Sequence, residues 1–198
     1  DGTRVYASFG SFGLYALTMG GEPVWQVDLG DMTNNGHGEG SSPLLHGGSV
    51  IVLWAHWGTS FLVSLDAPTG KERWRAPIPE GNNCSTPLLV DVHGEEQLVV
   101  GGYRTIAFDP KTGKERWSFG EAGGGNTTMA SPVALGELVL IPGHRPRSGA
   151  AQMRALVAMP GGEPAEELWT VRSDDNIPSL LAHDGKLYFV RGDPAALT

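Results

Sequence analysis

The sequence predicts an all-β fold, a β-propeller built from four-stranded antiparallel blades, and an internal repeat is the main reason. Residues 65–74 return almost unchanged as residues 108–117, 43 positions later, with Thr-Gly-Lys-Glu-Arg-Trp identical in both copies. A repeat of this period is typical of propellers, solenoids and arrays. The 29 Gly and 14 Pro among 198 residues favour many short strands joined by turns over long helices.

Each copy of the repeat also has the pattern of a tight turn followed by a strand. Asp66 and Asp109 precede the Thr-Gly pair, where an aspartate accepts backbone N–H groups and the glycine takes a positive φ. A strand then resumes at the lysine. The tryptophan lies four residues past the glycine, on the strand that leaves the turn.

The same period assigns the remaining strands. Four tryptophans mark it: Trp25, Trp74, Trp117 and Trp169. Apolar segments expected to be strands precede them at residues 14–17, 61–65, 105–108 and 155–159, and before these at 5–8, 50–54, 98–100 and 138–141. A further strand begins at prolines spaced 44, 45 and 46 positions apart: Pro43, Pro87, Pro132 and Pro178. Turns after that strand are expected at 47–48, 94–95, 136–137 and 184–185.

The second strands of these units, such as residues 50–53 and 138–141, are apolar on both faces. A sheet wetted on one side would alternate, so these sheets are expected to be covered on both sides, as in a propeller. A sandwich gives no reason for the repeat, and leucine-rich or β-helix repeats have much shorter periods. The chain, 1–198, is therefore predicted to be one partial propeller with blades at 3–28 (partial), 41–78, 85–119, 130–171 and 178–198 (partial).

Composition and charge argue against some partners. The formal net charge is −8 and the isoelectric point about 5.1, whereas nucleic acids and anionic membrane surfaces require a basic face. No apolar run approaches the roughly 18 residues of a membrane-spanning helix. The single cysteine, Cys84, excludes an internal disulfide and says little about the compartment.

At the repeated Leu/Phe-Asp-x-x-Thr-Gly-Lys-Glu-Arg-Trp, the sequence resembles the pyrroloquinoline-quinone-like (PQQ-like) propeller repeat family. The resemblance covers nearly the whole chain, but the motif degenerates outside the two copies, where Thr18 and Pro160 stand at the aspartate position. In the family the repeated tryptophan docks between neighbouring blades, which implies a structural role for all four tryptophans. The resemblance also implies seven or eight blades in a complete ring, so we expect further blades from a longer chain or from another copy.

The resemblance leaves two functions open. The family includes non-catalytic extracytoplasmic scaffold members, such as the propeller lipoprotein of outer-membrane β-barrel assembly, and quinoprotein dehydrogenases that oxidise alcohols or sugars with PQQ and calcium. The chain has no Cys-Cys pair of the kind often found beside that cofactor, and the calcium ligands and catalytic aspartate match no position. We therefore expect a bacterial, periplasmic or secreted binding module without a cofactor, with a segment of a dehydrogenase as the alternative.

A propeller tends to bind ligands at one end of its channel, where the loops that follow the second and fourth strands converge. In this chain those loops are polar and aromatic, which suits a protein, a small polar ligand or a saccharide. The candidate residues are His37, Glu39, His56, Trp57, Asn83, Tyr103, Arg104, Asn126, His144, Arg145 and Asp174. The alternative is that Asn, Asp, Thr and Gly at these positions simply form turns.

Three smaller patterns have structural explanations that we favour. The pair Asp174-Asp175 has the chemistry for acid–base work or cation binding, but adjacent acids in a loop are usually solvated. His37-x-Glu39, with two further histidines, contains metal-ligand types without a tight metal-site spacing. Cys84 has no fixed histidine partner and is expected to be a small buried or loop thiol.

Overall fold

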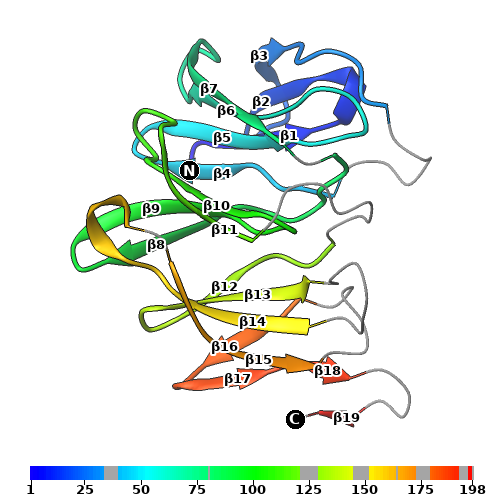
Figure 1. Ribbon diagram of the computed structural model, residues 1–198. Helices are drawn as coiled ribbons and strands as arrows, with labels where there is room; N and C mark the ends of the chain where they lie inside the picture. Colours follow the sequence, from blue (N-terminus) through cyan, green and yellow to red (C-terminus); the bar gives the residue numbers. More distant parts are fainter. Residues whose placement is uncertain are drawn as a thin grey trace.

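The computed structural model describes residues 1–33, 40–79, 81–120, 129–144, 152–163, 165–172, 179–191 and 196–197. Regular structure over this part of the chain is β-strand apart from two short 3-10 turns, η1 (Gly10–Phe12) and η2 (Pro160–Gly162). Antiparallel sheets follow one another in sequence order as an open array, which confirms the predicted all-β partial propeller (Figure 1). None of the described segments forms a helix long and apolar enough to cross a membrane.

Each sheet is a meander in which consecutive strands pair. The first sheet contains β1 (Arg4–Ser8), β2 (Leu14–Thr18) and β3 (Pro23–Val27). The second contains β4 (Leu44–His46), β5 (Ser49–Trp54), β6 (Ser60–Asp66) and β7 (Glu72–Ile78). The third contains β8 (Leu88–Val92), β9 (Glu95–Val100), β10 (Thr105–Phe108) and β11 (Glu115–Phe119). The fourth contains β12 (Val133–Leu135), β13 (Leu138–His144), β14 (Gln152–Val157) and β15 (Glu166–Arg172).

Two short ladders follow the fourth sheet. One pairs β16 (Leu181–His183) with β17 (Lys186–Tyr188), and the other pairs β18 (Val190–Arg191) with β19 (Ala196–Leu197). The first hairpin corresponds to the two strands expected from the last repeat of the sequence. The second ladder was not anticipated, because two-residue strands carry no periodic signal.

A β-bulge recurs at one position in each of the first four sheets. The tryptophans Trp25, Trp74, Trp117 and Trp169 lie opposite Ala16, Ser64, Ala107 and Ala155, respectively. The register shifts immediately before each tryptophan, so that one extra residue is accommodated there. The four extra residues are Val24, Arg73, Arg116 and Leu168. The repeat therefore encodes a shared strand irregularity as well as a turn.

The register corrects the alignment of the fourth repeat. In that sheet the residue beyond the bulge is Leu156, which corresponds to Leu65 in the second sheet. Val157, rather than Pro160, therefore stands at the position of Asp66, and β14 ends at Val157 instead of at residue 159. The prediction was wrong because the hairpin of the fourth sheet is longer, and counting from the apolar run misplaced its start.

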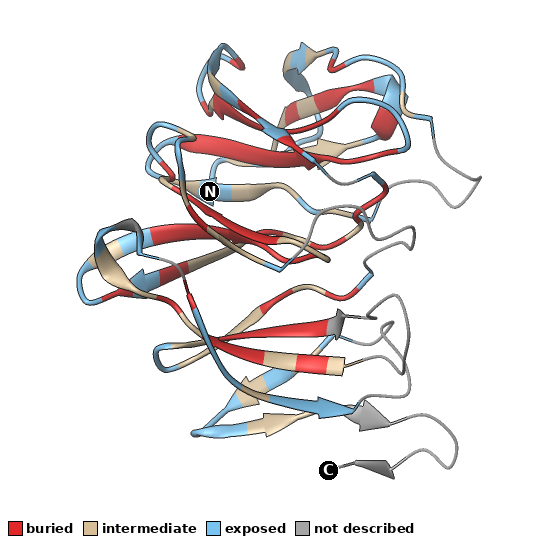
Figure 2. Cartoon of the chain, in the orientation of Figure 1, coloured by how far each residue is buried: buried red, intermediate tan, exposed pale blue. Residues whose placement is uncertain are grey.

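Among the described residues, three apolar clusters lie between neighbouring members of the first four sheets; we call these seams 1–2, 2–3 and 3–4. Alternate residues of β5 enter different clusters: Val50 and Val52 face seam 1–2, whereas Ile51 and Leu53 face seam 2–3. Burial on both faces explains why the second strands do not alternate. Figure 2 shows this burial in the middle strands of the second and third sheets, while β15 to β17 are more exposed.

Neighbouring sheets are also joined where their first strands begin. The backbone N–H of Ser42 donates to the hydroxyl of Thr86 at 3.0 Å, and the N–H of Thr86 donates to the hydroxyl of Ser131 at 2.8 Å. These residues immediately precede three of the spaced prolines, Pro43, Pro87 and Pro132. The hydroxyl of the residue before the proline thus accepts a hydrogen bond from the backbone of the preceding sheet. This contact recurs between sheets, and the spacing of the prolines alone did not reveal it.

Candidate functional site

The two ends of the sheets carry different connections. We call one end the turn face: it holds the hairpins after the first and third strands, such as residues 47–48, 67–71, 93–94 and 110–114. The opposite end, the loop face, holds the connections after the second and fourth strands. The three strands of the first sheet, β1 to β3, correspond to β5 to β7 of the second, so the connection that contains η1 also lies on the loop face. The candidate residues whose side chains the structure describes lie on the loop face, whereas the pockets described below lie on the turn face; these candidates are His56, Trp57, Asn83, Tyr103 and Arg104.

Several residues of the expected site fall outside the described residues: His37, Glu39, Asn126, Arg145 and Asp174. His144 is the last residue of β13, and only its backbone is described. Tyr103 is half-buried, two residues before β10 begins.

His56 and Trp57 form a loop that is tied to the segment ahead of the second sheet. His56 is buried, and its Nδ1 accepts the backbone N–H of Thr33 at 2.9 Å and of Gly58 at 3.1 Å. The N–H of Trp57 donates to the carbonyl of Thr33 at 2.8 Å, and the indole approaches the backbone at Gly81. The imidazole thus organises the loop, while Trp57 remains 49% exposed.

Asn83 and Arg104 also use their polar atoms within the protein. Asn83 is buried; its Nδ2 donates to the Gly101 carbonyl at 2.7 Å, and its Oδ1 accepts the N–H of Ser85 at 2.9 Å. Arg104 pairs with Glu115 at 3.0 Å. Both residues stabilise the connection and the outer strand next to it, as expected of buried or paired polar groups.

Two exposed aromatic residues at the loop face were missed by the sequence reasoning. Phe12, in η1, is 79% exposed, and Phe9, immediately before η1, is 54% exposed. The N–H of Phe9 donates to the Gly13 carbonyl at 3.0 Å, and the hydroxyl of Ser11 accepts the N–H of Met32 at 2.8 Å. Two phenylalanines within a Gly/Ser-rich turn were the available signal, because such a turn cannot bury both.

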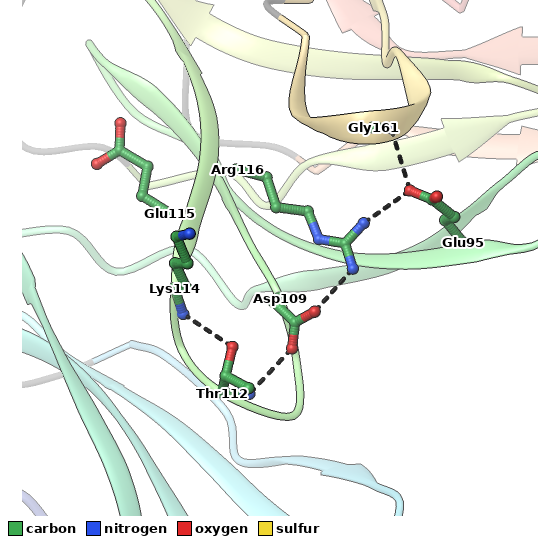
Figure 3. A pocket seen from close by; sticks show the side chains of 7 residues that line it. All are labelled: Glu95, Asp109, Thr112, Lys114, Glu115, Arg116 and Gly161. Atoms are coloured by element: carbon green, nitrogen blue, oxygen red, sulfur yellow. Dashed lines mark hydrogen bonds and ion pairs between the residues drawn. The ribbon is translucent and has the colours of Figure 1, made fainter.

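The described pockets lie on the turn face of the third sheet. The larger, about 460 Å³, is lined by Glu95, Asp109, Thr112, Lys114, Glu115, Arg116 and Gly161 (Figure 3). A neighbouring hollow of about 250 Å³ shares Glu95, Asp109 and Arg116 with it. Because Gly161 belongs to η2 of the fourth sheet, the larger pocket lies across seam 3–4.

Arg116, the bulged residue of the third sheet, links both carboxylates of this pocket. Its Nη2 lies 2.7 Å from Asp109 Oδ2 and its Nη1 lies 2.9 Å from Glu95 Oε2, which also accepts the N–H of Gly161 at 3.1 Å (Figure 3). Partial burial opposes ionisation of Asp109, but hydrogen bonds from Arg116, Lys111 and Thr112 outweigh it and lower the pKa. The hydrogen bond to Asp109 raises the pKa of Arg116. Both groups are therefore charged at neutral pH and unsuited to proton transfer there.

The second sheet contains the same pairing of the motif aspartate with the motif arginine, formed between Asp66 and Arg73. The fourth sheet takes no part in this pair. Arg73 Nη2 lies 2.6 Å from Asp66 Oδ2, and Nη1 donates to the hydroxyl of Ser49 at 2.8 Å. The hydroxyl of Thr69 donates to Asp66 Oδ1 at 2.7 Å; this bond and the one from Arg73 lower the pKa of Asp66. Aspartate, threonine and arginine of the motif therefore close the hairpin onto its bulged strand.

The tryptophans of the first two sheets contact the hairpin of the next sheet. Trp25 Nε1 donates to the Ala67 carbonyl at 2.9 Å, and Trp74 Nε1 donates to the Pro110 carbonyl at 3.2 Å. The indole of Trp74 lies against Gly113, where an added Cβ would come within 2.7 Å of Cδ2. The glycine of the motif is thus required by its positive φ of 69° and by the ring packed on it.

Seam 3–4 differs from the other two. Trp117 is buried, and its Nε1 donates to Gln97 Oε1 of its own sheet at 2.7 Å. Gln97 Nε2 then donates to the Met159 carbonyl in the fourth sheet at 2.9 Å. No described atom lies within 4 Å of a Cβ built on Gly161. The fourth tryptophan, Trp169, is half-buried.

A three-stranded sheet followed by three four-stranded antiparallel sheets, with an apolar seam between each neighbouring pair of these four, defines this chain as part of a β-propeller. A family model described as "Outer membrane protein assembly factor BamB" matches residues 11–193. The chain therefore belongs to this family of PQQ-like propeller repeats. No curated protein matches it.

Solved structures of similar fold include BamB and quinohemoprotein alcohol dehydrogenases. BamB from Moraxella catarrhalis is 19% identical, with a TM-score of 0.56, over 98% of this chain and 54% of that one. Quinohemoprotein alcohol dehydrogenase ADHIIG from Pseudomonas putida HK5 is 19% identical, with a TM-score of 0.57, over 95% and 37%. The quinohemoprotein alcohol dehydrogenase from Comamonas testosteroni is 17% identical, with a TM-score of 0.51, over 78% and 30%. The chain thus spans about half the length of BamB and about a third of the dehydrogenases.

Proposed function

We propose that the chain is part of a non-catalytic, extracytoplasmic propeller that binds a partner through its loop face. The observation that carries the proposal is the use of the motif residues: the aspartates, arginines and tryptophans of the repeat bond to backbone or side chains of the array itself. A motif used in this way builds a frame rather than a reaction centre. The match to the family model described as "Outer membrane protein assembly factor BamB", together with the likeness of fold to BamB, supports the same proposal.

The proposal includes docking of the four repeated tryptophans between neighbouring blades. The hydrogen bonds of Trp25 and Trp74 to carbonyls of the following sheet support it directly. Trp117 supports it indirectly, through Gln97, and Trp169 supports it by its equivalent place at the bulge. Further blades, from a longer chain or another copy, would continue the same contacts at either end of the array.

The loop face is the proposed contact surface because it presents aromatic rings on well-anchored loops. Phe9, Phe12 and Trp57 are exposed, and their loops are joined to the segment of Met32 and Thr33 by the hydrogen bonds described above. Exposed aromatic groups on a rigid support are favourable anchors for a protein partner, since little conformational entropy is lost on binding. A small polar ligand remains the alternative occupant of this face.

A segment of a quinoprotein dehydrogenase is the second candidate, favoured by the likeness of fold to two quinohemoprotein alcohol dehydrogenases. The described residues do not fit a cradle for PQQ and calcium. The oxygen of the Asn83 side chain and Nδ1 of His56 accept hydrogen bonds from nearby backbone N–H groups, and the described residues contain no group of three His, Cys, Asp or Glu side chains placed to hold a metal ion. We therefore derive no reaction step through that cofactor.

The test adds PQQ and calcium to the complete protein and follows the cofactor absorbance together with dye reduction by an alcohol or a sugar. The proposal predicts neither saturable binding nor dye reduction. Saturable binding with substrate-dependent dye reduction would contradict it. As a positive test, a photo-crosslinking residue at Phe12 should capture one defined protein in the native cell envelope, whereas the same residue at Lys114, on the turn face, should not.

A further inference from the structure

The connection that leaves β3 toward the second sheet lies between the two aromatic turns of the loop face. On one side, the N–H of Met32 donates to the hydroxyl of Ser11, the neighbour of Phe12, at 2.8 Å. On the other side, the carbonyl of Thr33 accepts the N–H of Trp57 at 2.8 Å. Two consecutive residues of one connection therefore join the turns that carry Phe12 and Trp57. We call the surface of these turns and this connection the aromatic strip; it consists of Phe9, Phe12, residues 28–33 and Trp57.

The backbone of the aromatic strip is held by contacts with the sheets beneath it. Leu29 is buried in the cluster of seam 1–2, and Met32 packs against the same cluster. Gly13, which follows Phe12, lies so close to the end of β3 that an added Cβ would come within 2.7 Å of the Val27 carbonyl oxygen. The exposed rings are therefore carried on anchored backbone, so binding a partner costs little conformational entropy.

Two carboxylates without a paired cation lie in the same connection. Asp28 and Asp31 are both exposed, and Oδ1 of Asp28 accepts the N–H of Gly30 at 2.8 Å. Neither carboxylate forms an ion pair with a lysine, arginine or histidine that the structure describes, whereas Asp66 and Asp109 each pair with the arginine of the motif. The negative charge of the connection therefore remains available to a partner beside the exposed rings.

Charge is also distributed unevenly along the chain. None of its 14 lysine and arginine residues falls within residues 5–70, a stretch that includes β2 to β6. The acids of this stretch are Glu22, Asp28, Asp31, Glu39 and Asp66. A basic partner is therefore attracted to this part of the protein and an acidic one is repelled. Arginine and lysine also bind favourably over aromatic rings, which the strip presents next to its carboxylates.

From these contacts we propose that the aromatic strip binds a segment of a partner protein that combines arginine or lysine with large apolar side chains. The inference rests on the proposed function, because it names the chemistry of the partner at the same face. Apolar side chains of the segment cover the phenylalanines, and its cations meet Asp28 and Asp31. The rings supply most of the buried area, and the carboxylates select a basic segment over an acidic one.

The experiment titrates the complete protein into fluorescein-labelled peptides of equal length and follows fluorescence anisotropy. The probe alternates leucine with arginine; one comparison peptide alternates leucine with glutamate, and the other alternates serine with arginine. The leucine–arginine peptide should bind at least about tenfold more tightly than either comparison peptide. Equal affinity for the leucine–glutamate peptide would overturn the selection by charge, and equal affinity for the serine–arginine peptide would overturn the role of the rings.

A double variant tests the two carboxylates. Asp28→Asn with Asp31→Asn should weaken binding of the leucine–arginine peptide at least about fivefold at low ionic strength. An asparagine at position 28 can still accept the N–H of Gly30, so the connection keeps its hydrogen bond. The control, Glu22→Gln with Glu137→Gln, removes the same charge from hairpins of the turn face and should change the affinity less than about twofold. Equal weakening by both double variants would overturn a local role for the strip.

A second matched pair tests the exposed ring. Phe12→Ser should weaken binding of the leucine–arginine peptide at least about fivefold. Met19→Ser, which changes an exposed apolar side chain in a hairpin of the turn face, should leave the affinity within about twofold. Both side chains are exposed, so neither change removes a core contact. Equal affinity of the two variants would contradict binding at the aromatic strip.

Photo-crosslinking at Phe12 separates this inference from the proposed function. The protein captured there should be lost when Asp28→Asn and Asp31→Asn are introduced together. Unchanged capture by that variant would overturn the basic partner and leave the proposed function intact. Selective binding of the leucine–arginine peptide without capture of any protein at Phe12 would support the chemistry of the strip and count against the proposed function.

Discussion

Seams 2–3 and 3–4 begin from the same strand irregularity and end with different contacts. In both, a tryptophan follows a bulged arginine and faces the next sheet, as Trp74 and Trp117 do. Trp74 bonds a backbone carbonyl of the next hairpin directly, whereas Trp117 reaches the next sheet only through Gln97. The comparison teaches that the repeat places the indole N–H donor at the seam, while the hairpin of the following sheet decides which group accepts its hydrogen bond.

The hairpins that face Trp74 and Trp117 differ in length and in how closely the indole approaches their backbone. In the third sheet the hairpin is the Thr-Gly turn of the motif, and its glycine lies under the Trp74 ring. In the fourth sheet a longer hairpin carries η2, and Ala158 and Ala165 join the cluster around Trp117. The carbonyl of Met159 in that hairpin therefore accepts a hydrogen bond from Gln97 rather than from the indole. Two substitutions at matched glycines therefore separate ring packing from turn strain.

The largest expected effect comes from Gly113→Ala, compared with Gly161→Ala. Both glycines have φ near 70°, at 69° and 71°, so the conformational cost of the methyl group is similar. Only at Gly113 would the Cβ meet the indole of Trp74. We expect Gly113→Ala to lower the free energy of unfolding by about 3 kcal/mol and Gly161→Ala by about 1 kcal/mol. Urea denaturation followed by circular dichroism measures both, and equal losses would show that the ring does not rest on Gly113.

The second expected effect is energetic coupling between Trp117 and Gln97. A double-mutant cycle with Trp117→Phe and Gln97→Leu should give a coupling of about 1–2 kcal/mol, because either single change leaves a buried polar partner unpaired. The control cycle pairs Gln97→Leu with Trp74→Phe, whose indole bonds in another seam, and should give a coupling close to zero. Similar coupling in the two cycles would mean that the indoles do not differ in their acceptors.

The smallest expected effect concerns acid and the ion pair of the motif. The pKa of Asp109 is lower in the folded protein than its ordinary value, so its contribution is present above about pH 4 and is lost as pH falls through the folded value. Asp109→Asn should therefore reduce stability by about 1 kcal/mol at pH 7 and flatten the loss of stability below pH 4. The exposed Asp31→Asn, which removes the same charge, serves as the control in thermal unfolding at pH 3 to 7. Parallel pH profiles for the two variants would argue against the pairing.

The repeated residues made the fold predictable, because the spacing of Asp66, Gly70 and Trp74 indicates a turn followed by a strand. The pairing of the motif aspartate with the motif arginine was not predicted, because spacing alone does not show which side chains meet. Val157 was missed as the counterpart of Asp66 because the longer hairpin of the fourth sheet shifted the count. Gln97 has no glutamine counterpart in the other repeats and looks like an ordinary strand residue, so no sequence pattern could connect it with Trp117.

The candidate site was less predictable than the fold. Polar loop letters do not reveal whether a side chain faces a ligand or its own backbone, and His56 and Asn83 prove to hold their loops together. Five of the expected residues fall outside the described residues, so their place in the site stays a prediction. The exposure of Phe12 and the pocket around Arg116 are determined by which groups stay uncovered after folding, and the sequence pattern does not predict that.

The exchange of the indole N–H protons with solvent, followed by nitrogen-15 NMR, tests directly whether each indole makes the hydrogen bond described above. The account predicts that the N–H of Trp117 exchanges most slowly, and that Gln97→Leu accelerates Trp117 at least about tenfold while leaving Trp25 and Trp74 unchanged. An unchanged Trp117 rate in that variant, or equal acceleration of all three indoles, would contradict it.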